Sequence, residues 1–327
     1  MILVVNLNPS LDKIYTLDDL PYGEASRAKT VQNTAGGKGT HVANVITALG
    51  HPCTVVGFLG GYVGQYIRHV LDERHIVHCC TTIEGETRSC INMATPDGKQ
   101  TEVLEPGPTI TEGEKNEFLA QYDFELKRSD LVVASGSLPK GLGDDFYGEL
   151  IRRAKEQGKP FLLDTSGSAL IQGLESVPYF IKPNESEVEV LTGHKLTDFE
   201  EAVQTLHELE GRGVAMPTIS LGKKGALLAH EGKVYRAVPP TVDKVINAVG
   251  SGDSFVAGLA TALDRGASPE EALRLAAACG TANVLEAESG VVDPEKVAAI
   301  QQEVQITQFY KKISENSISA VLTQGFR

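Results

Sequence analysis

Residues 246–260, which read INAVGSGDSFVAGLA, decide how the rest of the chain is interpreted. Gly250 and Gly252 permit a tight turn whose backbone N–H groups are unobstructed. Apolar residues then recur at helical spacing from Phe255 to Leu263. The segment therefore predicts a glycine turn that leads directly into a helix.

This turn has the properties of an anion site beside a carboxylate. The start of a helix has unpaired N–H groups and the positive end of the macrodipole, so Gly250, Ser251 and Gly252 would hold a migrating phosphoryl group. Asp253 would stand beside them as a base for an attacking hydroxyl. A plainer interpretation also fits, in which Ser251 and Asp253 only cap a helix. Other parts of the chain must decide between the two.

Composition and charge limit the classes of function. The 327 residues include 41% hydrophobic and 22% charged residues, so the chain can bury a full core. A formal charge of −13 argues against nucleic acid or an anionic membrane as the main partner. Phosphorylated substrates remain open, because salt screens distant carboxylates beyond about 8 Å.

The N-terminal segment lacks a signal-peptide pattern and no apolar run could span a bilayer, so we expect a cytoplasmic protein. The five cysteines contain no C-x-x-C pair and indicate neither a disulfide framework nor a zinc site.

Apolar runs alternate with helical patterns along most of the chain. The predicted buried strands are 2–7, 55–59, 130–134, 160–163, 179–181 and 217–221. The predicted helices between them include 62–73, 146–156 and three that start at the caps Thr111-x-x-Glu114, Thr197-x-x-Glu200 and Ser268-Pro269. Polar or glycine-rich residues follow successive strands, and in a doubly wound parallel sheet those positions meet at the ligand-binding edge.

Two segments, about 11–34 and 86–106, interrupt this pattern. The first is polar and irregular, and the second alternates like a hairpin, which is typical of a lid or small appended sheet. Arg88 lies in the hairpin, where a lone arginine is more often a solvated charge than a ligand. We predict one domain over residues 1–304 with these segments as its lid. Residues 305–327 show weak periodicity and are predicted as a peripheral or disordered extension.

A second glycine-rich turn, AGGKGT at residues 35–40, runs into a predicted helix that stops at Gly50. It is not a P-loop, because Gln32 replaces the first glycine and Gly39 replaces the Ser or Thr after Lys38. By the same dipole argument it is a candidate anion site with an added lysine. A plain strand-to-helix turn is the alternative.

Taken in order, these segments resemble the ribokinase-like (PfkB) carbohydrate kinases, in the branch of 1-phosphofructokinases and tagatose-6-phosphate kinases. The resemblance extends to about residue 303 and rests on the order of several short motifs. They are Asn8-Pro9-Ser10-Leu11-Asp12, Gly36-Gly37-Lys38-Gly39, Thr87-Arg88, Thr101-Glu102 with Pro106-Gly107-Pro108, 135–139, Asp164-Thr165-Ser166-Gly167, Lys182-Pro183-Asn184-x-x-Glu187, and 249–253. The family implies an α/β fold in which helices flank a parallel sheet in three layers, with a small β-sheet lid.

The resemblance also implies an activity. An ATP-dependent kinase of this branch phosphorylates the free primary hydroxyl of a ketohexose monophosphate to give a 1,6-bisphosphate, with Asp253 as base. The implied substrate-binding residues are Asp12, Arg27, Gly36, Gly37, Lys38, His41, Arg88 and Ser137, among which Lys38, Arg27 and Arg88 would meet the existing phosphate. The implied ATP-binding residues are Lys182, Asn184, Ser220, Gly222, Gly225 and Asn283, the last beside the base. Glu187, with Asn184, would orient Mg²⁺ through water.

One position departs from the family pattern. Thr40-His41 stands where the family usually has an apolar residue and an Asn that contacts the sugar. His41 would donate a hydrogen bond in its place, mark a different sugar, or only fill space under the lid. The preferred ketohexose also stays open, because residues 101–105 look more like the tagatose-6-phosphate type whereas residues 8–13 suit either.

Other functions fit the chain less well. A kinase of an unphosphorylated sugar or nucleoside would leave three cations, Arg27, Lys38 and Arg88, facing a neutral substrate. A non-catalytic sugar-phosphate sensor would not need Asp253 together with the ATP motifs. A dehydrogenase is disfavoured because Phe255 stands where the third glycine of G-x-G-x-x-G would be. Pairing of two subunits through the lid sheets stays open.

Overall fold

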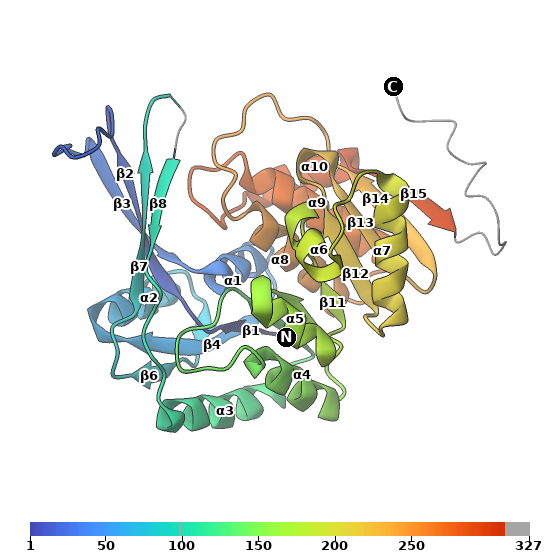
Figure 1. Ribbon diagram of the computed structural model, residues 1–327, viewed down its shortest axis with the longest axis horizontal. Coiled ribbons are helices and arrows are strands. Elements are labelled where there is room, and N and C mark those ends of the chain that lie inside the picture. The colour runs from blue at the N-terminus through green and yellow to red at the C-terminus, as the bar shows by residue number, and fades with distance from the viewer. Residues whose placement is uncertain (98–99, 311–327) are drawn as a thin grey trace.

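One large sheet forms the centre of the molecule (Figure 1). The computed structural model describes residues 1–97 and 100–310, and in these residues 11 strands form the sheet, in the order β15-β14-β13-β12-β11-β10-β9-β1-β4-β5 with β6 paired to β4. The parallel strands are β12 (Met216–Ser220), β11 (Phe180–Ile181), β10 (Phe161–Asp164), β9 (Leu131–Ser135), β1 (Ile2–Asn6), β4 (Cys53–Gly60), β5 (Val77–His78) and β6 (Thr81–Ile83). All six strands predicted from apolar runs belong to this parallel part.

An antiparallel extension completes the sheet beyond β12. It consists of β13 (Ala226–His230), β14 (Lys233–Val238) and β15 (Gln305–Tyr310), none of which the sequence predicted. Glu231 (φ 52°) and Gly232 (φ 74°) form the two-residue turn of the β13–β14 hairpin, and both have the positive φ of a type I′ turn. The extension expected from residue 305 therefore begins as an edge strand of the main sheet, and residues 311–327 lie outside the described part.

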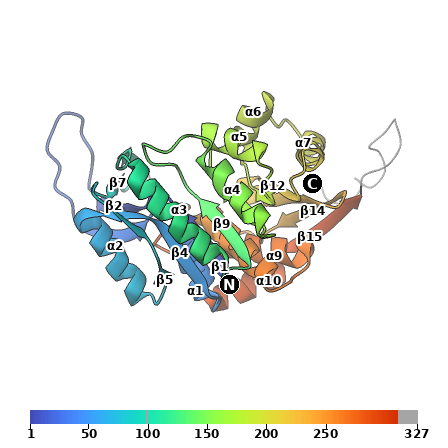
Figure 2. The same ribbon diagram turned by 90° about the horizontal axis from the view of Figure 1, so that it is seen from below.

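Helices cover both faces of the sheet, as Figure 2 shows most clearly. Successive strand residues point to opposite faces, so Ile2 and Val4 enter one core while Leu3 and Val5 enter the other. The first core includes α1 (Lys38–Ala48), α2 (Gly61–Glu73), α8 (Ser251–Asp264), α9 (Pro269–Asn283) and α10 (Pro294–Glu303). The opposite face carries α3 (Glu112–Leu126), α4 (Phe146–Glu156), α5 (Gly167–Glu175), α6 (Glu185–Thr192) and α7 (Phe199–Gly211). The predicted three-layer α/β fold is confirmed.

A separate small sheet projects from one side of the molecule (Figure 1). Its order is β3-β2-β7-β8, with β2 at Ser10–Thr16, β3 at Thr30–Gly36, β7 at Arg88–Ala94 and β8 at Gln100–Leu104. Ser10 pairs with Gly36 on one side and with Arg88 on the other. The predicted hairpin is thus present as β7 and β8, apart from residues 98 and 99, which lie outside the described part. The base of this sheet brings three distant segments together.

Most helix starts follow the predicted caps, with one correction. Thr111 and Ser268 form capping boxes with Glu114 and Glu271. The cap of α7 is Asp198, whose Oδ1 accepts from the backbone N–H of Glu201 at 2.9 Å, one residue later than predicted. Thr197 instead donates its backbone N–H and its hydroxyl to the Glu201 carboxylate, so it lies outside the helix. No helix among the described residues is long and apolar enough to cross a membrane.

Phe309 on β15 gives a test of the edge strand. Its ring lies 5.1 Å from that of Phe199 and packs on the core beneath α7. We expect Phe309→Ala to lower the free energy of unfolding by about 2 kcal/mol. The same substitution at a fully buried Phe costs ~3–5 kcal/mol, and the loss is smaller here because the ring is only partly buried. Urea unfolding measures this, with Thr307→Val on an exposed strand position as control. Equal losses in both variants would contradict the packing role.

Candidate active site

The glycine turn before α8 is built as the sequence predicts. Gly250 is the N-cap, with φ 85°, and α8 begins at Ser251. A Cβ at Gly250 would lie 2.4 Å from the Gly290 nitrogen, so no other residue fits. The Ser251 hydroxyl donates to the Gly280 carbonyl at 2.9 Å. Asp253 follows in the first turn of α8 and is 6% exposed.

Asn283 holds this turn in place. It is fully buried, and its Nδ2 donates to the Val249 carbonyl at 2.9 Å. Its Oδ1 accepts from the Gly290 N–H at 2.8 Å and from the Ser254 hydroxyl at 3.1 Å. Asn283 is not among the residues that line the cavity described next, and its predicted place beside the nucleotide base stays a prediction. Sequence alone could not show that a polar residue at the end of α9 faces inward.

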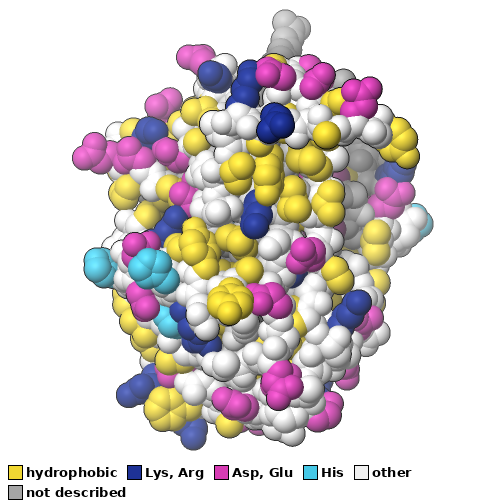
Figure 3. Space-filling model, turned by 90° about the vertical axis from the view of Figure 1, so that its left-hand side faces the viewer, with side chains coloured by type: hydrophobic (Ala, Val, Ile, Leu, Met, Phe, Trp, Pro, Cys, Tyr) yellow, Lys and Arg dark blue, Asp and Glu magenta, His cyan; other side chains and the backbone are white. Residues whose placement is uncertain are grey.

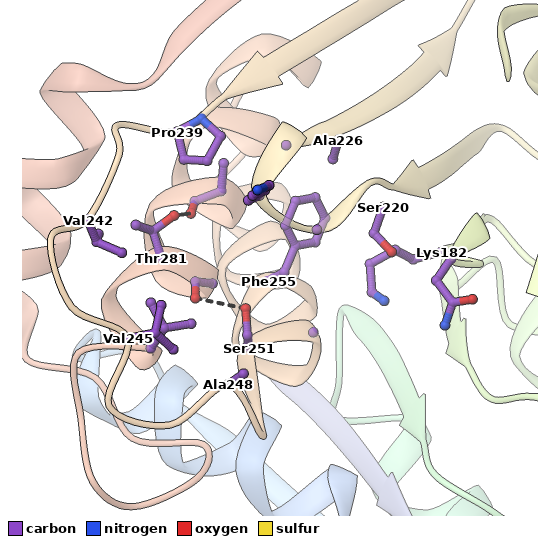
Figure 4. A pocket seen from close by; sticks show the side chains of 18 of the residues that line it. Lys182, Ser220, Ala226, Pro239, Val242, Val245, Ala248, Ser251, Phe255 and Thr281 are labelled. Atoms are coloured by element: carbon purple, nitrogen blue, oxygen red, sulfur yellow. Dashed lines mark hydrogen bonds between the residues drawn. The ribbon is translucent and has the colours of Figure 1, made fainter. Parts of the chain in front are cut away.

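A cavity of about 860 Å³ opens beside the start of α8 (Figure 4). Ser251, Gly252 and Phe255 of α8 line it. Five of the six predicted ATP-binding residues also line it, namely Lys182, Asn184, Ser220, Gly222 and Gly225. The remaining wall comes from residues that the sequence did not indicate, including Pro239, Pro240, Thr241, Val242, Val245, Ala277 and Thr281. Residues 239–245 form a loop of this wall. Its apolar side chains, such as Val245, are exposed, and a sequence does not reveal that exposure.

Two lysines meet at one buried carboxylate between the cavity and the small sheet. Asp164, at the end of β10, lies 3.2 Å from Lys182 Nζ and 3.4 Å from Lys38 Nζ. Burial alone would raise the pKa of Asp164, but the two ammonium groups and the Ser135 hydroxyl outweigh it and hold that pKa below its usual value. The charge of Asp164 in turn raises the pKa of Lys38. Lys182 Nζ lies only 3.5 Å from where a Cβ of Gly252 would be, so it borders the turn.

The second cluster lies where the small sheet meets the first strand of the main sheet. Burial raises the pKa of Asp12, which accepts from the Ser10 hydroxyl at 2.6 Å. A Cβ at Gly36 would lie 2.1 Å from Asp12 Cγ, so any larger residue there would have to displace the Asp12 carboxyl group. Arg88 donates through Nε to the Asn8 carbonyl at 3.2 Å, and Asn8 donates to the Ser137 hydroxyl at 3.1 Å. Five predicted substrate-binding residues, Asp12, Gly36, Gly37, Arg88 and Ser137, thus gather near the start of α1.

His41 lies between this cluster and Asp253. It is 5% exposed, and its Nδ1 is 2.8 Å from Asp253 Oδ2. Its Nε2 faces Asp12 Oδ2 at 3.7 Å. The site therefore has a cavity lined in part by Lys182, a carboxylate at a helix start, and a polar cluster beyond it. Such an arrangement suits phosphoryl transfer, which depends on positioning and charge neutralisation.

Comparison with known proteins identifies the family. The pattern of the pfkB family carbohydrate kinases matches residues 5–296. This chain belongs to that family. A tagatose-6-phosphate kinase of Staphylococcus epidermidis is 40% identical over 309 residues, which cover 94% of this chain and 99% of that protein. The predicted family and its kinase activity are confirmed, and ATP is the phosphoryl donor that such a kinase uses.

Two solved structures show the same fold. Phosphofructokinase-2 of Escherichia coli in complex with fructose-6-phosphate is 26% identical and has a TM-score of 0.85, covering 92% of this kinase and 98% of that chain. A possible 1-phosphofructokinase of Thermotoga maritima is also 26% identical, with a TM-score of 0.85 and coverage of 94% and 99%. Both are sugar-phosphate kinases by name, and the match spans nearly the whole chain.

The predicted cluster of three cations does not form within this chain. Arg27 is exposed in the loop beyond the far end of β2 and β3, whereas Lys38 pairs with Asp164 and Arg88 lies near Asp12. The paired residues from Asp12 to Thr16 of β2 and from Thr30 to Thr34 of β3 separate Arg27 from the base of the small sheet. A sequence shows which cations are present but not at which end of a hairpin each lies. Arg27, Lys38 and Arg88 therefore do not converge on one phosphate site within a single chain.

Glu187 and Asn184 are tied to one another at the start of α6. Asn184 Oδ1 accepts from the backbone N–H of Glu187, and Glu187 Oε2 accepts from that of Asn184, each at 2.9 Å. Among the described residues, no group of three or more His, Cys, Asp or Glu could hold a metal ion. The charge of Glu187 reaches the site, since it adds to the effect of Asp164 on the pKa of Lys38. The residues present thus fit contact with a metal through water.

The shared carboxylate gives a test of the lysine arrangement. Asp164→Asn leaves the buried Lys182 unpaired, and we expect it to lower the free energy of unfolding by about 3 kcal/mol. Lys38→Met should cost much less, because Lys38 is 45% exposed and Asp164 keeps Lys182 as its partner. Chemical denaturation at neutral pH compares the two. An equal or larger loss in Lys38→Met would show that Asp164 does not hold Lys182 in this way.

Proposed function

We propose that this kinase transfers the γ-phosphoryl group of ATP to the free primary hydroxyl of a ketohexose monophosphate, giving a ketohexose 1,6-bisphosphate. The observation that carries the proposal is the place of Asp253. It lies in the first turn of α8, whose Ser251 and Gly252 line the cavity, and it contacts His41 on the side of Asp12. The names of the relatives, tagatose-6-phosphate kinase and phosphofructokinase, support a sugar phosphate as acceptor.

Each group has a task in the proposed reaction. The acceptor hydroxyl loses its proton to the Asp253 carboxylate as its oxygen forms a bond to the γ-phosphorus, and the bond from that phosphorus to the β–γ bridging oxygen breaks to release ADP. The N–H groups at the start of α8 hold the transferring group. Lys182 at the inner end of the cavity neutralises its charge. Mg²⁺, held by the nucleotide and through water by Glu187, would supply further charge neutralisation.

The sugar would be bound by the second cluster. Asp12 and the backbone at Gly37 are placed to hold hydroxyls, and Arg88 is the cation nearest to them for the existing phosphate. Lys38, between Asp164 and the start of α8, is better placed for the transferring phosphate than for the existing one. The alternative substrate is an unphosphorylated sugar. Because Arg27 lies away from Lys38 and Arg88, fewer cations would face such a neutral substrate, and the experiment below decides between the two substrates. A cytoplasmic location, where ATP is available, remains part of the proposal.

A substrate comparison tests the proposal. We expect Mg²⁺-dependent ADP release with tagatose 6-phosphate, fructose 6-phosphate or fructose 1-phosphate, and little with fructose. Asp253→Asn should lower kcat by several orders of magnitude while ATP binding persists, because only the base is lost. A coupled ADP assay and calorimetry with an ATP analogue measure the two. Turnover of fructose alone would favour the alternative substrate class, and unchanged kcat in Asp253→Asn would remove that residue as base.

We further propose that two copies pair through the small sheet. Tyr15, Val31, Ile91, Met93 and Val103 occupy matching positions on neighbouring strands and therefore share one face, opposite to that of Asp12 and Arg88. Val31 is 52% and Val103 51% exposed. Figure 3 shows hydrophobic side chains gathered on this side of the molecule. Such a patch on a projecting sheet is typical of a subunit interface.

Sedimentation measures this pairing. The doubly substituted Val31→Lys, Val103→Lys protein should sediment as a monomer at concentrations where the wild type is a dimer, because four buried lysines per interface would be unpaired. Gln32→Lys, on the opposite face of β3, is the control and should remain dimeric. A monomeric wild type, or a double variant that still pairs, would overturn the proposed interface.

A further inference from the structure

His41 connects two carboxylates that come from different layers of the molecule. Asp253 belongs to α8, Asp12 belongs to β2 of the small sheet, and His41 on α1 contacts both through opposite ring nitrogens. An ionised carboxylate only accepts hydrogen bonds, so the 2.8 Å contact to Asp253 places a hydrogen on Nδ1. A residue that served the sugar alone would not need this bond.

The position of the ring is fixed by its surroundings. A Cβ at Gly290 would lie 2.2 Å from His41 Cβ, so the backbone at Gly290 packs directly on the residue. Gly290 is held in turn by the Asn283 amide. His41 therefore cannot withdraw towards the loop after α9, and its ring stays between Asp12 and Asp253.

The charges around the ring favour its protonated form. Burial alone lowers the pKa of His41, but the hydrogen bond and charge of Asp253, the charge of Asp12 and that of Glu288 in the loop after α9 outweigh it, so the pKa is raised above 6.5. Two of these acidic groups have a cation beside them: the charge of Arg88 acts on Asp12, and Arg74 pairs with Glu288. Three acidic groups thus face one imidazole.

We propose that His41 is a positioning residue that joins the catalytic base to the sugar site: its imidazolium donates from Nδ1 to Asp253 Oδ2 and presents Nε2–H to Asp12. This rests on the proposed function and explains why the residue differs from the Asn usual in the family. His41 holds one oxygen of Asp253 and leaves Oδ1 to take the hydroxyl proton, while His41 keeps both of its own protons. The base and the small sheet are thereby linked by charge.

The proposal has a defined pH dependence. Because the folded pKa is raised, the link is fully present below the unfolded value near 6.5 and is lost as the pH rises through the folded value. The wild type should therefore lose kcat/KM for the sugar phosphate on the alkaline side as Nε2 loses its proton. A variant without the imidazole has no such limb.

His41→Asn separates this role from that of a sugar ligand, because it restores the residue usual in the family. We expect kcat to fall by roughly 10- to 100-fold, through misplacement of the base. The KM for ATP should be unchanged and the alkaline limb absent. Steady-state kinetics over a series of pH values from below 6.5 upward measures all three. A variant that keeps the wild-type kcat and pH profile and raises only the KM for the sugar phosphate would overturn the proposal.

A second measurement needs no turnover. Thermal unfolding of the wild type, His41→Asn, Asp253→Asn and the double variant should show non-additive losses at about pH 6, with a non-additivity that becomes smaller towards pH 9, where the neutral ring keeps its Nδ1 hydrogen bond but has lost its charge. Additivity at both pH values would overturn the link. A wild type that phosphorylates no sugar phosphate would instead overturn the proposed function, and this cycle would still test the contact between His41 and Asp253.

Discussion

The side chain of Asn283 fixes the turn on which the active site depends. A helix start can hold a phosphoryl group only if its N–H groups are directed to one point, and glycines that permit such a turn do not by themselves keep it in place. Asn283 bonds to the carbonyl of Val249 before the turn, to Ser254 within α8 and to Gly290 across from it. One buried amide thus ties together the three segments around Gly250. The same bond to Gly290 fixes the wall against which His41 packs.

Much of the fold could be predicted from the sequence because parallel strands buried on both faces have a simple signature. Segments such as 2–7 and 130–134 are apolar throughout, and the polar residues after them mark the edge where ligands bind. The antiparallel strands were missed for a physical reason. β13 and β14 contain His230, Lys233 and Arg236 among their apolar residues and follow a lysine-rich turn, so neither continuous apolarity nor a regular alternation indicates them. β15 is defined mainly by its pairing with β14, which is a tertiary contact.

The sequence indicated several residues that the fold brings together at the candidate site, but not the contacts among them. Lys182, Ser220 and Gly252 follow from their places at strand ends and at a helix start, and all three line one cavity. Charged residues were harder to place, because a long side chain joins whichever opposite charge the fold brings near. Lys38 was expected at the sugar phosphate, and in the folded chain it shares Asp164 with Lys182. Asp164 lies 126 residues from Lys38 and 18 residues from Lys182 along the chain, so only folding brings the three together.

Buried charges alternate in sign among the described residues of the site. On the nucleotide side, Asp164 lies between two lysines, and on the sugar side, His41 lies between two carboxylates. Asp253 stands where the two groups meet, since its charge acts on both Lys38 and His41. Burying these ions singly would cost several kcal/mol each. Alternating their signs lets the protein place the proposed base, two lysines and the Asp12 carboxylate within one buried centre, and a histidine beside the proposed base also preserves this balance.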